Sequence, residues 1–239
     1  MTRLFSDLGF RWKITLPISA LAILLVLMGA VGMRGIERVA DSSELLATRH
    51  LPAIGLLLNA DRDLYQAFVA ERSLLDSDAG AHAQALKASH AENLKQAYDR
   101  VQKYAAMQPG RDALALVEQF NRGFEQWSTV SKRVIEQVEQ NPQAASALSF
   151  GDSESRFDAM RDAIDKLGEL EEAAADAEGQ AALAEGAATA TQQGVVLLIG
   201  LLGCVVLVLG LPLVVLRPMR RLLDRLQQIA EGDGDLRAR

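Results

Sequence analysis

Cysteine, aromatic residues, glycine and proline are scarce in this sequence of 239 residues. The one cysteine, Cys204, lies in an apolar run near the end of the chain, so residues 34–193 can hold neither a disulfide nor a thiolate metal site. Aromatic residues make up 5% of the chain, and residues 34–193 contain only 12 of its glycines and prolines. This composition argues against a β-barrel or β-sandwich and favours long helices.

Charged residues are absent from two long stretches, Ile14 to Met33 and Gly194 to Leu216. A helix needs roughly 20 apolar residues to cross a bilayer, so both stretches are predicted to be transmembrane helices, which argues against a wholly soluble or a disordered chain. A cleaved signal peptide is the alternative for the first stretch, with a weak cleavage site near Gly29 to Gly32. The run is longer than the about 7–15 residues of a signal sequence, which favours an uncleaved anchor.

Charge is distributed unevenly along the chain. Residues 34–193 carry 16 basic and 26 acidic residues, whereas the two ends carry 9 basic and 5 acidic residues. Basic residues flank the apolar runs on the outer sides: Arg3, Arg11 and Lys13 before the first, and Arg217, Arg220, Arg221 and Arg225 after the second. Because basic residues next to membrane segments stay in the cytoplasm, both termini are predicted to be cytoplasmic and residues 34–193 to be translocated.

The translocated segment is predicted to contain four helices, of which the first continues the N-terminal apolar run to about residue 76. Pro52 is expected to bend or loosen this helix. Its predicted buried face consists of Ile54, Leu58, Tyr65, Phe68 and Leu75. The second helix is predicted at about 81–107, with a buried face of Ala83, Leu86, His90, Leu94, Ala97, Val101 and Tyr104.

The third helix follows a break at Pro109–Gly110 and has the most regular pattern, in which steps of three and four residues alternate. Its stripe is Val117, Phe120, Phe124, Trp127, Ser131, Val134 and Val138, which is typical of a helix packed in a bundle. Asn141–Pro142 ends or interrupts it, and residues 143–151 are ambiguous. Gly151–Asp152 is predicted to act as a stop and an N-cap. The fourth helix begins at about residue 153 and continues into the second apolar run, with apolar positions Phe157, Met160, Ile164, Leu167 and Leu170.

These helices predict an all-α fold. The short connections near residues 77–80 and 108–111 make successive helices antiparallel. Since the first and fourth helices continue into the apolar runs, we expect a periplasmic antiparallel four-helix bundle that stands on two transmembrane helices.

A further helical segment follows the second apolar run. Its opening Pro218 suits a first helical turn, its apolar stripe is Met219, Leu222, Leu226 and Ile229, and it closes with Glu231-Gly232-Asp233. This segment resembles the first helix of a HAMP domain. The second HAMP helix is missing because the sequence ends at Arg239, so we expect the chain to be a fragment of a longer protein.

The whole chain then resembles the sensory half of a bacterial methyl-accepting chemotaxis receptor of the four-helix-bundle class. The stretch Leu56 to Ala67 is similar to the first-helix motif of such receptors. The resemblance implies an inner-membrane homodimer whose outer bundle binds a small-molecule ligand. A small shift of a membrane-crossing helix would pass the signal through HAMP to a cytoplasmic signalling domain and its kinase and adaptor.

The expected organisation is a cytoplasmic N-terminus (1–13), a first transmembrane helix (14–33), a periplasmic sensor domain (34–193), a second transmembrane helix (194–216) and a partial HAMP domain (217–239). Two other functions stay open. The chain could belong to a sensor histidine kinase or cyclase, since both also contain HAMP domains, or it could be a membrane-anchored bundle without a ligand.

No catalytic constellation is present in the sequence, so we expect no enzymatic activity, no cofactor, no metal site and no nucleic-acid partner. The three histidines are His50, His82 and His90, and no glycine-rich phosphate loop precedes a helix. Glu171-Glu172, Asp158, Asp162 and Asp165 are best explained as a solvated helical face. His90 lies on the buried face of its helix and is expected to be a hydrogen-bonded core histidine.

The candidate ligand-binding residues are Arg62, Arg72, Asp61 and Tyr65, all on the first helix of the bundle. On a helical wheel Asp61, Tyr65 and Arg72 lie within about 20° of Ile54, so both charges point into the predicted buried face. Asp61 and Arg72 are roughly 16 Å apart along the helix and cannot pair with each other, so each needs a partner on another helix, on a second protomer or in a ligand.

Arg62 lies at the edge of that face. The alternative to a ligand pocket is a buried polar layer or an ion pair between protomers that fixes the register. Since a guanidinium can bind both oxygens of a carboxylate, Arg62 and Arg72 indicate a small organic acid or amino acid as the ligand.

Overall fold

The computed structural model describes residues 10–76, 80 and 82–230. Within these ranges the chain consists of helices and short connections without a β-strand, which confirms the all-α prediction. The chain divides into two compact units: residues 40–182 form one, and the other contains the chain up to Val39 and from Leu183 onward.

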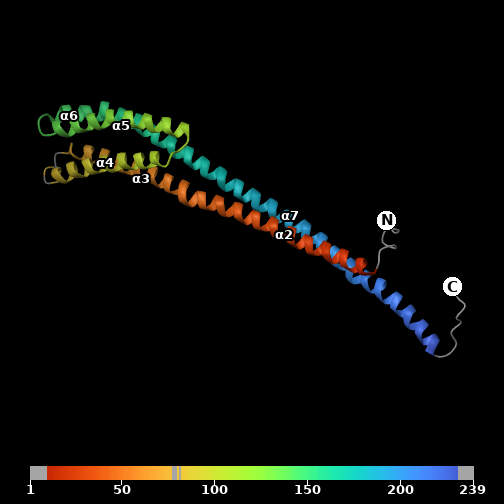
Figure 1. Cartoon of the computed structure of the whole chain (residues 1–239). Helices are drawn as coiled ribbons and strands as arrows, with labels where there is room; N and C mark the ends of the chain where they lie inside the picture. The colour runs from red at the N-terminus through yellow and green to blue at the C-terminus, as the bar shows by residue number, and fades with distance from the viewer. Residues whose placement is uncertain (1–9, 77–79, 81, 231–239) are drawn as a thin grey trace. The chain divides into compact units, whose positions relative to one another are not determined.

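The unit of residues 40–182 is an antiparallel four-helix bundle (Figure 1). Its helices are α3 (Leu51–Ser73), α4 (Ala83–Ala106), α5 (Arg111–Gln137) and the first part of α7 (Glu154–Ala230). The direction of packing follows from pairs of contacting residues: Phe68 stacks on Phe157, whereas His50 contacts Glu171, so α3 and α7 run in opposite directions. The predicted breaks lie where the sequence places them, since α4 ends before Pro109–Gly110 and α5 begins at Arg111.

Aromatic side chains from α4, α5 and α7 fill the core of the bundle. Trp127, Tyr104, Phe120 and Phe157 are fully buried, and the rings of Trp127 and Phe157 meet edge to face at 5.0 Å. The buried faces predicted for α5 and for most of α4 are confirmed, although Ala83, Leu86, Phe124 and Val138 are only partly covered. Burial of each large apolar side chain contributes about 1.5–3 kcal/mol, so these rows of residues determine how the helices pack.

The buried face predicted for α3 is wrong by about one residue. Leu58 and Tyr65 are 63% and 46% exposed. The buried residues of α3 include Ala53, Leu57, Ala60, Leu64, Ala67 and Glu71, which follow alternating steps of four and three, and Asp63 and Ala70 beside them are buried as well. Small alanine side chains bring the backbone of α3 close to its neighbours, and the larger side chains then lie at the flanks of the contact.

The segment 142–153 is helical, and the predicted stop at Gly151–Asp152 is wrong. Helix α6 (Pro142–Leu148) is capped by the Asn141 side chain, which accepts a hydrogen bond from the Ala144 amide. The π-turn η3 (Ser149–Ser153) then leads directly into α7. Gly151 therefore lies inside a helical turn rather than at a helix end. The side chains of Ser149 and Ser153 hold this turn, since both are buried and hydrogen-bonded to Glu71 of α3.

The long helix predicted from the first apolar run to about residue 76 is continuous, but it contains a π-turn. Helix α2 (Phe10–Leu45) is followed by the π-turn η1 (Leu46–His50) and then by α3. The Leu51 amide donates to the Leu46 carbonyl, five residues back. Pro52 lacks an N–H group and its ring would clash with the carbonyl four residues earlier, so the wider turn before it loosens the helix, as predicted.

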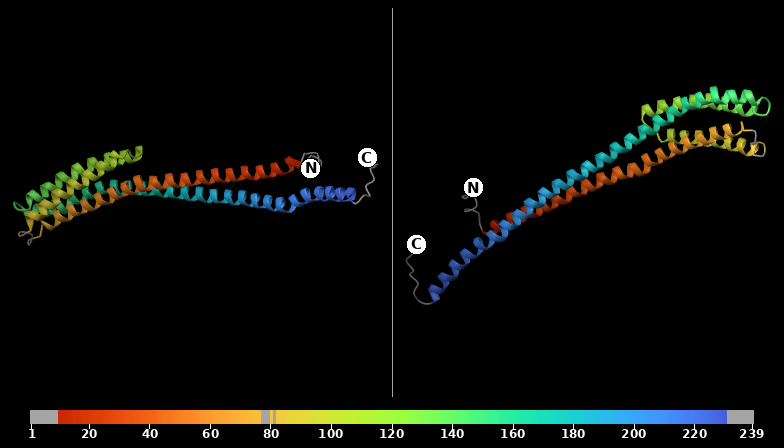
Figure 2. Two further views of the ribbon diagram at one scale, coloured as in Figure 1. Left: turned by 60° about the horizontal axis from the view of Figure 1, so that its bottom comes forward. Right: turned by 180° about the vertical axis from the view of Figure 1, so that it is seen from behind.

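The second unit contains α2 up to Val39 and α7 from Leu183, which lie side by side (Figure 2). A Cβ atom added to Gly35 would lie 2.4 Å from the Thr189 side chain, so glycine is required for this close approach. Arg38 and Glu185 form an ion pair beside it. Among the described residues, two helical stretches, within Arg11–Ser73 and Pro142–Gly210, are long and apolar enough to cross a membrane.

Helix α7 continues through Pro218 to Ala230, without a break where the HAMP segment is predicted to begin. The closing residues Glu231-Gly232-Asp233 and the basic residue Arg3 lie outside the described residues. The domain boundaries at 13, 33, 193 and 216 remain predictions.

Candidate ligand-binding site

Asp61 has a partner in its own chain. Both of its carboxylate oxygens accept from Arg161 on α7, at 2.7 Å from Nε and 3.2 Å from the terminal nitrogen. The same guanidinium lies 5.0 Å from the centre of the Tyr65 ring. The hydrogen bond that Arg161 donates to Asp61 raises the pKa of the Arg161 guanidinium, which therefore stays charged. The partner that Asp61 requires on another helix is therefore Arg161 of α7.

Arg72 is also held within the chain. One terminal nitrogen of its guanidinium donates to the Ser149 carbonyl and to Glu154 Oε2, each at 3.1 Å. The group also lies 3.7 Å from the centre of the Phe150 ring and 4.8 Å from that of Phe68. Its side chain is only 18% exposed, so Arg72 links α3 to η3 and the start of α7.

Arg62 differs from Asp61 and Arg72 because it is more than half exposed. Its Nε and terminal nitrogen both donate to Asp63 Oδ1, at 3.2 and 2.8 Å, and its side chain is 53% exposed. Asp63 is completely buried, and its other oxygen lies 2.9 Å from Arg100 Nε of α4. Two guanidinium groups thus share one carboxylate, which leaves an excess positive charge at this point of the surface.

A groove of about 520 Å³ between α3 and α4 begins at Arg62. Tyr65 forms part of its wall. The lining residues are Arg62, Tyr65, Gln66, Val69 and Ala70 of α3, and Leu86, Ser89 and Asn93 of α4. The groove therefore combines one cation with amide and hydroxyl groups and a strip of apolar side chains. This arrangement can accept a carboxylate at one end and a mixed polar and apolar body along its length.

The groove between α3 and α7 has the opposite charge. Its floor is apolar, and Asp61, Asp165, Glu169 and Glu172 all line it. In the part of the chain that the structure describes, these acids are paired with the guanidinium of Arg161, which contacts Asp61 and Asp165. An anionic ligand would be repelled there, so of these two grooves only the one between α3 and α4 suits the predicted organic acid.

Two buried glutamates were not recognised from the sequence. Glu71 on α3 accepts hydrogen bonds from Ser149 and Ser153 of η3. Glu171 on α7, which the sequence analysis assigned to a solvated face, accepts from Tyr104 and contacts His50 of η1. Regular steps of three and four through α3 would have placed Glu71 and Asp63 on or beside its buried face.

His90 is a core histidine, as the sequence analysis interpreted it. Its Nε2 lies 2.7 Å from the Ser131 hydroxyl of α5. Burial, together with the positive charge of Lys132, lowers the pKa of His90 to about 4. The side chain is therefore neutral at physiological pH, and its role is to pack α4 against α5 through the contact with Ser131.

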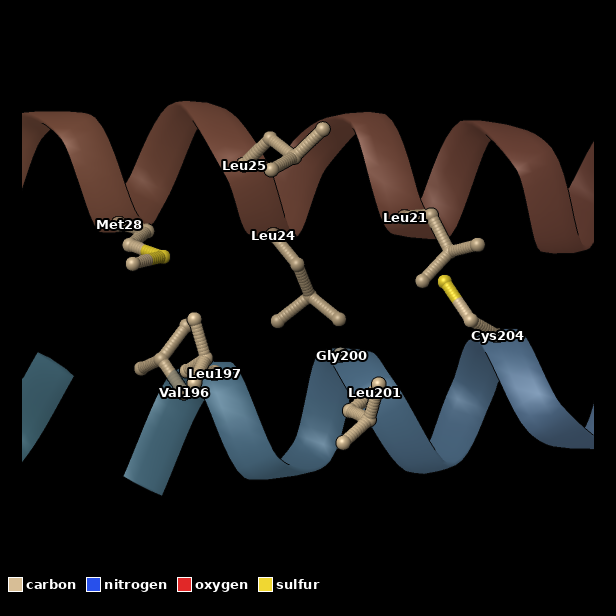
Figure 3. A pocket seen from close by; sticks show the side chains of 9 residues that line it. All are labelled: Leu21, Leu24, Leu25, Met28, Val196, Leu197, Gly200, Leu201 and Cys204. Atoms are coloured by element: carbon tan, nitrogen blue, oxygen red, sulfur yellow. The ribbon is translucent and has the colours of Figure 1, made fainter. Parts of the chain in front are cut away.

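The second unit contains a groove of a different kind, between α2 and α7 (Figure 3). Leu21, Leu24 and Met28 face Val196, Leu197 and Cys204 across it. Its walls are almost entirely apolar, so it offers no hydrogen bonds to a water-soluble ligand. Among the described residues no group of three or more His, Cys, Asp or Glu side chains could hold a metal ion.

The chain matches a known family model over most of its length. Residues 7–185 match the family model described as "Four helix bundle sensory module for signal transduction". No curated protein and no solved structure matches the chain. The match covers α2 to α5 and the whole of the bundle that contains the groove between α3 and α4.

Proposed function

Because the chain belongs to the four-helix-bundle sensory modules of methyl-accepting chemotaxis proteins, we propose that it senses a small extracellular ligand at the bacterial inner membrane. In this proposal residues 34–193 lie in the periplasm, residues 14–33 and 194–216 cross the membrane, and both termini are cytoplasmic. The signal passes through the membrane helices and a HAMP segment (217–239) to a cytoplasmic signalling domain, its kinase and its adaptor. The basic flanks of both apolar runs support this orientation.

The proposed ligand is a small organic acid or amino acid bound in the groove between α3 and α4. The observation that carries this assignment is the half-exposed Arg62 at the groove, where two guanidinium groups share the single buried carboxylate of Asp63. A ligand carboxylate would supply the missing negative charge. Gln66, Ser89 and Asn93 would bind polar groups further along the groove.

Of the other candidate residues, Tyr65 forms the wall of this groove, whereas Asp61 and Arg72 are assigned a structural role. Arg161 already occupies both oxygens of Asp61. Arg72 does not line the groove and binds η3 and Glu154.

A homodimer is proposed as well, and an apolar stripe on α3 supports it. Leu51, Leu58, Tyr65 and Val69 are all exposed, and their spacings of seven, seven and four place them on one side of the helix. A second copy of the chain could cover this stripe in a parallel arrangement.

The ligand assignment is tested by replacing Arg62 with Ala in the full chain, reconstituted in nanodiscs. A thermal-shift screen of organic acids and amino acids on the parent chain first identifies the compound to titrate. Loss of a charge-assisted hydrogen bond of about 1.5–3 kcal/mol should weaken its binding roughly 10- to 150-fold, with little change in melting temperature.

The matched control is Arg122→Ala on α5, which also removes an exposed guanidinium, 68% exposed and 3.9 Å from Glu118. This variant should bind like the parent. The assignment fails if Arg62→Ala binds the compound as tightly as the parent, and the ligand-free bundle is favoured if no compound in the screen binds.

A further inference from the structure

Each of the two π-turns contacts a buried glutamate from the neighbouring long helix. At one end of the bundle, Ser149 and Ser153 of η3 donate to Glu71 of α3. At the other end, His50 of η1 contacts Glu171 of α7. A π-turn is an uncommon and poorly bonded interruption of an α-helix, so it persists where other contacts hold it.

The cluster at η1 joins three helical segments through one carboxylate. Glu171 Oε1 accepts from the Tyr104 hydroxyl of α4 at 2.7 Å, and Oε2 lies 3.2 Å from His50 Nδ1. The side chains of Glu171 and His50 are 8% and 11% exposed. Arg49, also in η1, donates to the carbonyl of Gln108 just after α4. The turn is thus tied to the end of α4 as well as to α7.

A π-turn contains one more residue than the α-helical turn it replaces. If η1 rewound as an α-helix, the helix before it would turn by about 100° and shift by roughly 1.5 Å relative to α3. Helix α2 is continuous from Phe10 to Leu45, so its residues would turn together. A change within one turn of the bundle would thereby reach the predicted membrane span.

We propose that Glu171, His50 and Tyr104 form a lock that holds η1 as a π-turn, and that release of the lock changes the rotational phase of α2. The use of this rotation for signalling rests on the sensory role proposed above. The lock itself depends only on the contacts just described. Helix α4 supplies both Tyr104 and one wall of the groove at Arg62. A ligand that moves α4 against α3 would therefore act on the hydrogen bond between Tyr104 and Glu171.

The experiment is a cysteine scan of α2 next to the turn, in the full chain in nanodiscs and in a Cys204→Ser background. Single cysteines replace residues 40–45 one at a time, and the alkylation rate of each is measured. In the parent, positions 42 and 45 are partly buried and should react more slowly than the exposed positions 40, 41, 43 and 44.

Glu171→Met removes both carboxylate oxygens at similar side-chain volume. In this variant the slowly alkylated positions among residues 40–45 should move by one residue. Glu171→Gln should keep the parent pattern, because an amide can still accept from Tyr104 and donate to His50. Glu71→Met is the matched control at η3 and should also leave the pattern at 40–45 unchanged. Deletion of Ala47 removes the extra residue of the turn, so Glu171→Met should have no effect on the pattern in that background.

The proposal is overturned if Glu171→Met leaves the slow positions in place, or if all six positions become uniformly fast. It is equally overturned if Glu71→Met causes the same shift, or if the shift persists after deletion of Ala47. Should Glu171→Met fail to fold, His50→Leu breaks the lock from the other side and is judged by the same outcomes. The scan uses no ligand, so a failed ligand titration leaves this test unaffected, and a failed scan leaves the ligand site at Arg62 unaffected.

Discussion

Replacing Arg72 with Ala should destabilise the bundle and leave ligand binding unchanged. The charge-assisted bond to Glu154 is worth less than about 3 kcal/mol because Glu154 is nearly half exposed. Loss of the contacts with the Phe150 and Phe68 rings removes roughly another 1 kcal/mol. The Ser149 carbonyl also loses its donor. Together these losses amount to about 2–4 kcal/mol.

For a chain of this length each kcal/mol changes the melting temperature by about 2–4 °C, so Arg72→Ala should lower it by roughly 5–15 °C. The assay is thermal unfolding of the full chain in nanodiscs, followed by circular dichroism, together with titration of the compound identified for the parent. Arg72→Lys should fall between the parent and Arg72→Ala, because lysine keeps the charge but loses the planar stacking.

Arg62→Ala provides the contrasting profile, with weakened binding and an almost unchanged melting temperature. The reasoning is refuted if Arg72→Ala melts like the parent and loses the ligand. That result would mean that the guanidinium leaves Glu154 and Ser149 to bind the ligand, and the structural role assigned to Arg72 would be wrong.

Two further predictions concern the core and the dimer. Because the pKa of His90 is lowered to about 4, the unfolded chain binds the extra proton first as pH falls, so the bundle should lose up to about 3 kcal/mol between pH 6.5 and pH 4. Urea midpoints measured across this range should show a smaller loss for His90→Gln, which keeps a bond to Ser131 without titrating, and an equal loss would contradict the assignment. Single cysteines at positions 58 and 65 on the exposed face of α3 should form disulfides between protomers in membranes, whereas a cysteine at the exposed position 114 of α5 should not. Equal crosslinking at all three positions would argue against a specific parallel dimer.

Local sequence patterns determined most of the helical architecture. The apolar runs need only length and the absence of charge to be recognised, and Pro109–Gly110 breaks the chain whatever surrounds it. The stripe of α5 predicts its core face because large apolar residues recur at regular steps. The family resemblance was likewise visible from the sequence, and the match over residues 7–185 confirms it.

The buried face of α3 depended on packing that no local pattern reveals. The predicted face rested on large side chains such as Leu58 and Tyr65, which lie at the flank of the contact or in solvent. The face that packs is marked by small alanines, which contribute little hydrophobic area themselves but permit a close approach. Counting the large apolar residues along α3 therefore identified the wrong face of this helix as buried.

The roles of the charged residues were decided only by the tertiary structure. Asp61, Asp63 and Glu71 find their partners in Arg161, Arg100 and the serines of η3. These partners lie far away in sequence, and whether a charge is paired inside the chain or left to bind a ligand depends on which helices become neighbours. Residue types and spacing determined where helices form and which stretches are apolar enough to cross a membrane, whereas the packing of four helices determined that Arg62 lies exposed at a groove and that Arg72 is part of the structure.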